Sequence, residues 1–174
     1  MRTIDDRSEW EGGLADVMLF QPLNDGDRHT IWNRGELLFF EAGELVIQDG
    51  DLSPSFFVVL DGTVKVHVIE DGKDVYLCSL GKGATFGEAS LFLKMPRTAN
   101  VTAVDPTIVL KLTRYDVLEF VRQSPTAGNR MLLVIIYQLM KKLREANREL
   151  AYERRGDADQ AEVDALIADL AGGQ

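Results

Sequence analysis

Short apolar runs separated by turn residues fill the middle of the chain, from Leu37 to Leu112, and constrain its fold more than any other feature. Runs of this length and spacing are typical of an all-β sandwich or barrel, whereas a βαβ sheet needs long helical crossovers. The clearest strand is Thr63–Ile69, where valines alternate with other residues, so this strand is expected to bury one face only. Asp71-Gly72 then predicts a type I′ hairpin turn into a partner strand at Asp74–Leu80.

Further strands are predicted on both sides of this hairpin. They cover Ser55–Leu60, Ala99–Val104 and Thr107–Leu112, and Asp105-Pro106 supplies the turn between the last two. The first forty residues give only weak helical hints, at Leu14–Leu19 and Trp32. The middle of the chain is therefore expected to be β structure.

A helical period replaces the strand pattern after Arg114. Its spacing predicts a helix over Tyr115–Gln123, which Ser124-Pro125 ends, since the residue before a proline disfavours helix and proline suits the first turn of a new one. A long helix is expected from about Thr126 to Arg154. Its apolar stripe has coiled-coil steps of four and three residues: Leu132, Ile136, Leu139, Leu143, Ala146 and Leu150. We expect two chains to pair through it; packing of the stripe on the chain's own body is the alternative.

Charge is unevenly distributed along the chain. The formal net charge is −9, from 28 acidic and 19 basic residues, which argues against non-specific binding to nucleic acid or anionic lipid. Residues 1–129 carry a net −8, 130–155 a net +4 and 156–174 a net −5. With the last proline at position 125, this division predicts a body over 1–125, the long helix over 126–155 and an acidic tail over 156–174 with a short helix at Asp159–Leu170. That tail cannot hold a helix-turn-helix, so direct DNA binding is not expected.

The cysteine content and apolar runs bear on the compartment. Cys78 is the single cysteine, as is usual in a reducing environment. No N-terminal stretch resembles a signal peptide, and the longest strongly apolar run, Met131–Tyr137, is far shorter than the roughly 20 residues that span a bilayer. We therefore expect a cytoplasmic protein without a membrane segment.

The residues with the clearest chemistry lie between Gly81 and Ala103. A short helix starting at Gly87-Glu88 would present free backbone N–H groups, which stabilise an anion together with the helix dipole. Arg97 offers a planar fork that can donate to two phosphate oxygens at once. A carboxylate such as Glu88 is repulsive beside an anion unless it accepts hydrogen bonds from a neutral group, for example a ribose hydroxyl. Together these residues predict a site for a sugar phosphate.

These residues resemble the phosphate-binding cassette of cyclic-nucleotide-binding domains, as in the catabolite activator and the regulatory subunit of cAMP-dependent kinase. The resemblance runs from about Leu19 to Leu150 and rests on Gly43-Glu44, Gln48-Asp-Gly-Asp51, Phe56–Leu60, Asp61-Gly62, Gly72-Lys73, Leu80-Gly-Lys-Gly83, Phe86-Gly-Glu88, Pro96-Arg-Thr-Ala99 and Val101. It implies an α+β, mainly β fold. That fold is an eight-stranded β-roll (a double-stranded β-helix or jelly roll) with N-terminal helices, a short cassette helix and a long C-terminal helix.

The resemblance also implies a cyclic purine nucleotide as ligand and gives roles to individual residues. Glu88 would accept a hydrogen bond from the ribose 2′-hydroxyl, and Arg97 would bind the cyclic phosphate. The other implied contacts are the backbone of Gly87, Ala89 and Ser90 at the phosphate and sugar, Leu77, Cys78 and Phe86 along the purine, Thr98 with its neighbour Ala99 at the base or phosphate edge, and Asn147 of the long helix as a lid residue.

The expected function is that of a stand-alone sensor, not an enzyme, which binds cAMP and signals by moving its final helix within a homodimer or toward a downstream protein that the sequence does not identify. The ligand choice between cAMP and cGMP stays open, and cAMP is favoured because the bacterial members of the family mostly use it. The alternative function is a ligand-free interaction module, in which Glu88 and Arg97 form only a surface ion pair.

Enzymatic functions find little support in the sequence. His29 and His67 lie in no cluster at metal-ligand spacing, so neither a metal site nor a cupin-type enzyme is expected. No recognisable motif links a serine or cysteine to a histidine base, which argues against a hydrolase.

Overall fold

The structure, a computed structural model, describes residues 1–171, with side-chain surroundings for residues 1–148 and 150–152. It divides into two compact units, Met1–Val134 and Ile135–Gln174. The sequence predicted the body to end at residue 125, and this division stays a prediction. Ala127 and Met131, in the first turns of the last helix, are buried.

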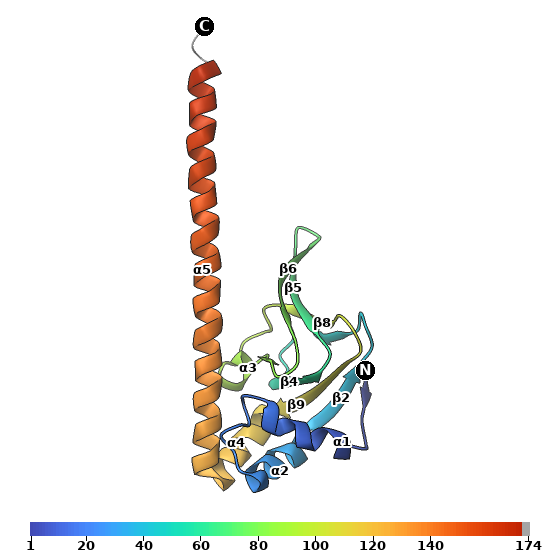
Figure 1. Cartoon of the computed structure of the whole chain (residues 1–174). Helices are drawn as coiled ribbons and strands as arrows, with labels where there is room; N and C mark the ends of the chain where they lie inside the picture. The colour runs from blue at the N-terminus through green and yellow to red at the C-terminus, as the bar shows by residue number, and fades with distance from the viewer. Residues whose placement is uncertain (172–174) are drawn as a thin grey trace. The chain divides into compact units, whose positions relative to one another are not determined.

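Nine strands of the described chain form two antiparallel sheets in the first unit (Figure 1). One sheet has the order β1-β2-β9-β4-β7, and the other has the order β3-β8-β5-β6. The strands are β1 (Arg2–Thr3), β2 (Glu36–Phe40), β3 (Leu45–Ile47), β4 (Ser55–Asp61), β5 (Val64–Glu70), β6 (Lys73–Leu80), β7 (Thr85–Phe86), β8 (Asn100–Ala103) and β9 (Thr107–Thr113). The β-roll prediction is confirmed, with β1 as an additional short strand.

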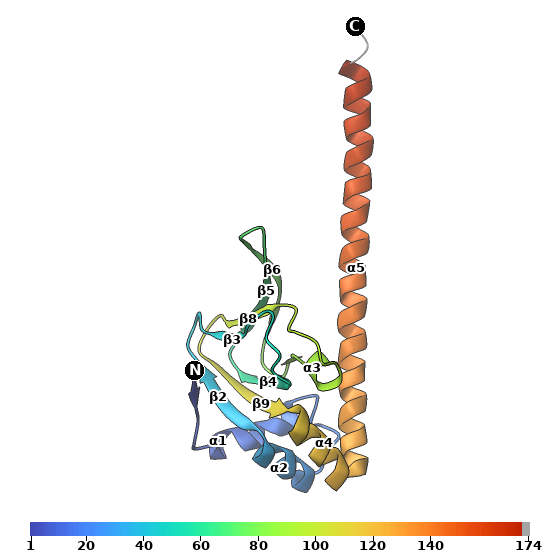
Figure 2. The ribbon, with the colours of Figure 1, turned by 180° about the vertical axis from the view of Figure 1, so that it is seen from behind.

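The five-stranded sheet is buried on both faces. One face joins the other sheet in a core that contains Leu38, Phe40, Phe57, Val59 and Val109, and Phe57 stacks on Phe86 with ring centroids 5.1 Å apart. The side chains that alternate with these and point to the opposite face are at most 1% exposed: Leu37, Phe56, Val58, Leu110 and Leu112. Helices lie along that second side in both views (Figures 1 and 2). This double burial explains why the central strands are continuous apolar runs in the sequence.

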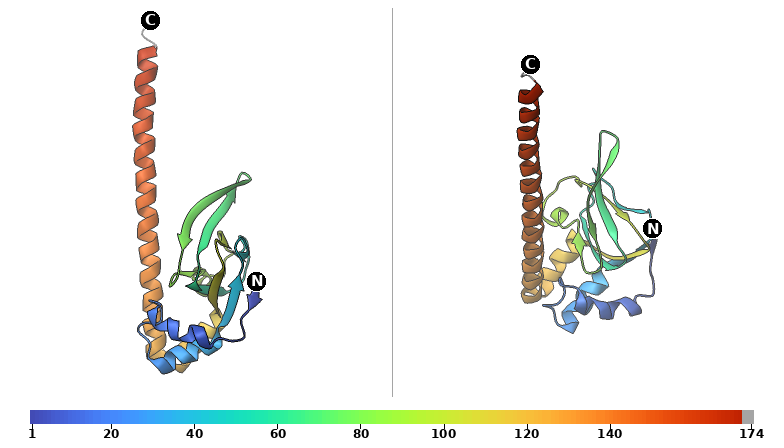
Figure 3. Two further views of the ribbon diagram at one scale, coloured as in Figure 1. Left: turned by 45° about the vertical axis from the view of Figure 1, so that its right-hand side comes forward. Right: turned by 45° about the horizontal axis from the view of Figure 1, so that its top comes forward.

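The hairpin predicted at Asp71-Gly72 is confirmed. Asp71 has φ 50° and Gly72 has φ 76°, the two positive values that a type I′ turn requires. Strands β5 and β6 pair on either side of this turn, and the hairpin extends beyond the rest of the two sheets (Figure 3). Its outer strand, β6, is an edge strand of the four-stranded sheet.

The prediction that β5 buries only one face is wrong at His67. The β5–β6 register shifts between Val66 and His67, and His67 is only 8% exposed. Its Nδ1 lies 2.6 Å from Asp74 Oδ1, and its Nε2 lies 2.9 Å from Thr102 Oγ1. Both ring nitrogens of this buried imidazole therefore have hydrogen-bond partners, which makes its burial tolerable.

Asp74 is expected to make the stability of this sheet depend on acid pH. The hydrogen bond from Lys65, followed by that from His67, lowers the pKa of Asp74 from its ordinary value of 3.8. A lowered carboxyl pKa contributes stability above the ordinary value, and this contribution is lost as the pH falls through the lowered one. Urea unfolding between pH 5 and pH 2 should show a smaller loss of stability below about pH 4 in Asp74→Asn than in the wild type. Identical pH profiles would contradict this assignment.

Three short helical elements precede the first long strand: α1 (Ser8–Glu11), the 3-10 helix η1 (Gly12–Asp16) and α2 (Asp25–Arg34). Asn24 caps α2 by accepting a hydrogen bond from the backbone N–H of Asp27 at 2.8 Å. Ile31 and Trp32 are the buried residues of α2. With so few apolar residues, this helix has little of the periodicity that a sequence pattern could reveal.

The chain passes directly from β9 into α4 (Arg114–Gln123), close to the predicted helix. Thr113 and Asp116 form a reciprocal capping box at its start. After Ser124, helix α5 (Pro125–Ala171) crosses α4 closely, since a Cβ at Gly128 would lie 2.7 Å from the Cα of Val121. The two helices therefore meet almost backbone to backbone at this corner.

Helix α5 is longer than predicted. It continues to Ala171 as one helix, whereas the sequence predicted an end near Arg154 and a separate short helix at Asp159–Leu170. No proline follows Pro125, and a lone glycine in a helix costs only about 1 kcal/mol, so the composition does not stop the helix. The side chains of the predicted short helix lie outside the described residues. Within the described part of the chain, no helix has an apolar stretch long enough to cross a membrane.

Candidate functional site

The backbone of Arg97 is fixed by the loop between β3 and β4. Its N–H donates to Asp51 O at 2.8 Å, and its carbonyl accepts from Gly50 N–H at 3.0 Å. Gly50 and Asp51 belong to the Gln48-Asp-Gly-Asp51 segment noted in the sequence, and this pairing shows what that segment does locally. It holds the Pro96-Arg97 segment against the loop that leads into β4. From this position the Arg97 side chain reaches Gly87 and Ser90.

The guanidinium of Arg97 donates hydrogen bonds to neutral acceptors. Nη1 donates to Gly87 O at 3.0 Å and to Ser90 Oγ at 3.1 Å, and Nη2 donates to Ser55 O. Gly87 permits this arrangement because it has φ +75°, and a Cβ there would lie 2.8 Å from Nη1. The cassette and the first residue of β4 thus hold one edge of the guanidinium.

The other edge of the guanidinium remains available. A guanidinium has five N–H donors on three nitrogens, and these contacts involve Nη1 and Nη2. Among the described residues, Nε donates to no acceptor, and Nη2 donates only to Ser55 O. Burial lowers the pKa of Arg97, while the nearby Asp51 and Glu88 carboxylates act through space to raise it. A two-oxygen anion at the Nε–Nη2 edge would favour the charged form further.

The short helix of the cassette is α3 (Ala89–Phe92), and Glu88 is its N-cap residue. Two of the N–H groups expected to be free are used inside the turn, because Ser90 N donates to Gly87 O at 3.2 Å and Leu91 N donates to Glu88 O at 3.0 Å. In the described chain the Ala89 N–H has no such acceptor. Glu88 is only 5% exposed, so its carboxylate is largely shielded from solvent.

The other predicted site residues lie in different environments. Leu77 and Cys78 are exposed on the edge strand β6, and Thr98, which directly follows Arg97, is exposed as well. Phe86 is a core residue, stacked on Phe57, and Ala99 is half-buried. Asn147 is exposed on α5 in the second unit. The structure thus brings Gly87, Ser90 and Arg97 into contact, and the contacts of the remaining residues with a ligand stay predictions.

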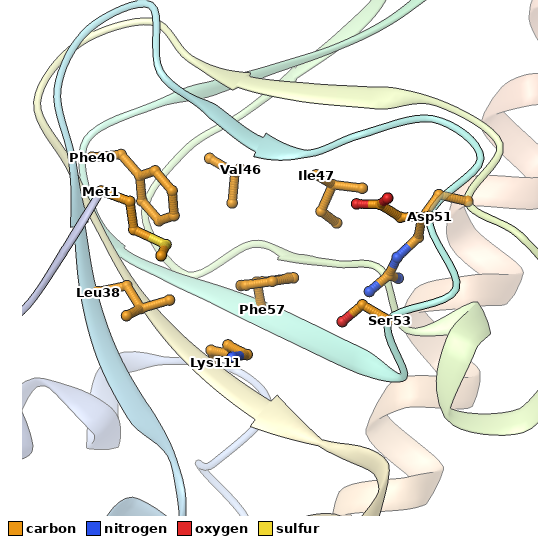
Figure 4. A pocket seen from close by; sticks show the side chains of 10 residues that line it. Met1, Leu38, Phe40, Val46, Ile47, Asp51, Ser53, Phe57 and Lys111 are labelled. Atoms are coloured by element: carbon orange, nitrogen blue, oxygen red, sulfur yellow. The ribbon is translucent and has the colours of Figure 1, made fainter.

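A cavity of about 150 Å³ lies next to Arg97 inside the β-roll (Figure 4). Asp51 and Ser53 lie at the end of the cavity opposite Met1 and Phe40 (Figure 4). The full lining is Met1, Leu38, Phe40, Val46, Ile47, Asp51, Ser53, Phe57, Arg97 and Lys111. Pockets for small organic ligands usually measure about 300–1,000 Å³. This cavity alone is therefore too small to hold a nucleotide, and most of a bound nucleotide would have to lie on the exposed surface of the cassette.

Two features of the site have no signal in the sequence. Ser55 contributes a backbone carbonyl, and its partner Arg97 lies 42 residues away. The Ser90 hydroxyl lies between that carbonyl and Arg97, whereas the sequence suggested a role only for the Ser90 backbone. In the described part of the chain, no three His, Cys, Asp or Glu side chains group as metal ligands would.

Comparison with known proteins finds matches that include the cassette residues. The sequence model described as "Cyclic nucleotide-binding domain" matches residues 37–124, about half of the chain. Over 116 residues the chain is 32% identical to the cAMP-dependent protein kinase type II regulatory subunit of Drosophila melanogaster, covering 67% of this chain and 30% of that protein. The chain thus spans less than a third of that relative.

Solved structures share the fold. The crystal structure of the Thermus thermophilus catabolite activator protein matches with a TM-score of 0.67 and 29% identity, over 76% of this chain and 61% of that one. The regulatory domain of Toxoplasma gondii PKA, crystallised with cAMP, matches with a TM-score of 0.58 and 25% identity, over 72% and 48%. With its cassette, its β-roll and the matching sequence model, the chain belongs to the cyclic-nucleotide-binding domain family.

Proposed function

We propose that this protein is a cAMP sensor, with the cyclic phosphate bound at the Nε–Nη2 edge of Arg97. The observation that carries the proposal is the anchored guanidinium, which keeps two donors on one edge while the opposite edge is held by Gly87, Ser90 and Ser55. Paired donors in a fixed plane match two oxygens of a phosphate. Two matching proteins, the Toxoplasma gondii domain and the Drosophila melanogaster subunit, carry cAMP in their names.

The remaining parts of the nucleotide would lie along the cassette and the edge strand. Glu88 would accept from the ribose 2′-hydroxyl, a neutral donor that its carboxylate can approach without repulsion. Leu77 and Cys78 are exposed and adjacent on β6, where they would cover one side of the purine. Asn147 on α5 would contact the base if α5 closes over it. Thr98 would contact the base or the phosphate edge.

Signalling would proceed through α5 and a second copy of the chain. The described part of α5 carries seven large apolar or aromatic residues that are each at least 51% exposed, several of them at coiled-coil spacing: Leu133, Ile136, Tyr137, Met140, Leu143, Leu150 and Tyr152. Pairing of two such helices would remove this surface from water. A nucleotide shifts such an equilibrium only by the difference in its affinity for the two arrangements of the helix, so contacts from α5 to the ligand would supply the signal.

Isothermal titration of the full chain with cAMP, cGMP and 5′-AMP tests the proposal. We expect saturable binding of cAMP, weaker binding of cGMP, and no comparable binding of 5′-AMP, since the open phosphate carries a further charge and a different shape. Sedimentation of the same samples should give the mass of a dimer. Folded, ligand-free protein that takes up neither cyclic nucleotide would contradict the proposal and favour an interaction module instead.

A further inference from the structure

Ser90 lies at the centre of the contacts beneath the cassette. It is 9% exposed, and its Oγ lies 2.8 Å from Gly87 O and 3.0 Å from Ser55 O. The hydroxyl can donate its one proton to either carbonyl, and it accepts a hydrogen bond from Arg97 Nη1 at 3.1 Å. The Ser90 side chain thus contacts each of the three groups that surround it.

The same two carbonyls also accept hydrogen bonds from Arg97. Nη1 donates to Gly87 O at 3.0 Å, and Nη2 donates to Ser55 O. If the Ser90 hydroxyl were absent, both carbonyls would keep Arg97 as a donor, so no buried carbonyl would lose its last partner. Loss of the hydroxyl would therefore mainly affect the guanidinium, because the Ser90 hydroxyl is the second acceptor for Nη1.

We propose that Ser90 is a positioning residue, whose hydroxyl fixes the rotation of the Arg97 guanidinium so that its Nε–Nη2 edge faces the anion site. This inference rests on the proposed function, in which that edge binds the cyclic phosphate. Gly87 O, Ser90 Oγ and Ser55 O together hold the Arg97 guanidinium in one orientation before the ligand binds. A side chain that is already ordered loses less conformational entropy on binding than a mobile one, which increases affinity.

Binding measurements on Ser90→Ala test the effect on affinity. We expect the dissociation constant for cAMP to rise about threefold to tenfold, the range for ordering one flexible side chain. Ser90→Thr keeps the hydroxyl and should bind more tightly than Ser90→Ala. Ser8→Ala is the matched control, because Ser8 is exposed, its hydroxyl donates to Asp6 Oδ1 at 2.7 Å, and it makes no hydrogen bond to Arg97 among the described residues. A folded Ser90→Ala variant with wild-type affinity would overturn the inference.

Side-chain ¹⁵N spectra of the ligand-free protein provide a readout that is independent of cAMP. The anchored Arg97 should give separate, slowly exchanging Nη signals in the wild type and in Ser8→Ala, and a single averaged signal in Ser90→Ala. Arg97→Lys identifies the signals by removing them. Failure of the wild type to bind any cyclic nucleotide would refute the proposed function, and these spectra alone would then decide whether Ser90 orients Arg97. Unchanged Arg97 signals in Ser90→Ala would refute the positioning role.

Discussion

Replacement of Arg97 by lysine should weaken cAMP binding at least about a hundredfold, because two charge-assisted hydrogen bonds of about 1.5–3 kcal/mol each depend on its planar edge. Lysine keeps the positive charge but presents one compact ammonium group, which cannot donate from two fixed positions in a plane. It also cannot bridge Ser55 O and Gly87 O while facing a ligand. Isothermal titration of Arg97→Lys with cAMP measures the loss.

The matched control for this change is Arg122→Lys. Arg122 lies on α4, its side chain is 75% exposed, and it pairs with Glu119 of the same helix at 2.8 Å. The same chemical substitution at this position should leave cAMP affinity within about twofold of the wild type, since exposed ion pairs contribute little. A loss of less than about threefold in Arg97→Lys, in protein with an unchanged circular dichroism spectrum, would show that the phosphate lies elsewhere.

Replacement of Gly62 by alanine should destabilise the β-roll by about 2–4 kcal/mol, the combined cost of a left-handed alanine and of overpacking. Gly62 has φ +81° in the turn between β4 and β5. A Cβ there would lie 2.5 Å from Pro106 O, 2.7 Å from Thr107 Oγ1 and 2.8 Å from Asp105 Oδ1. The turn before β9 would have to move, although Thr63 N–H donates to Asp105 Oδ1 at 2.8 Å. Urea unfolding measures the loss.

Gly43→Ala separates the two parts of this cost. Gly43 has φ +85°, but a Cβ there would meet no atom within 4 Å, so only the backbone conformation opposes alanine. We expect a loss of about 1 kcal/mol at Gly43, clearly smaller than at Gly62. Equal losses in the two variants would mean that the contact with the second turn contributes nothing to stability.

Sequence patterns predicted the strands correctly where turn residues and side-chain alternation within a few positions determine them. The turn at Asp71-Gly72 and the strands around it were confirmed because turn conformation and side-chain alternation act over a few residues. Alternation failed at His67, where a register shift places an imidazole against Asp74 and Thr102. Such a shift depends on the partner strand, so β5 by itself contains no sign of it. Helix α2 was only hinted at, since it buries just Ile31 and Trp32.

The candidate site shows a similar limit. Arg97 could be singled out because a guanidinium near a glycine-punctuated turn is chemically distinctive. Its acceptors could not, because Ser55 O is a backbone atom 42 residues away and any residue type would supply it. The hydroxyl of Ser90 has a role only once these two segments meet. Residue types therefore sufficed to nominate Arg97 and Gly87, whereas the way they meet Ser55 and Ser90 required the tertiary structure.

The close crossing of α4 and α5 has a mechanical consequence. Val121 Cα lies only 2.7 Å from where a Cβ at Gly128 would be, so any larger residue at position 128 would push the first turns of α5 away from α4. The capping box at Thr113 fixes the start of α4 at the end of β9. The absence of a side chain at position 128 therefore sets the direction in which the chain leaves α4.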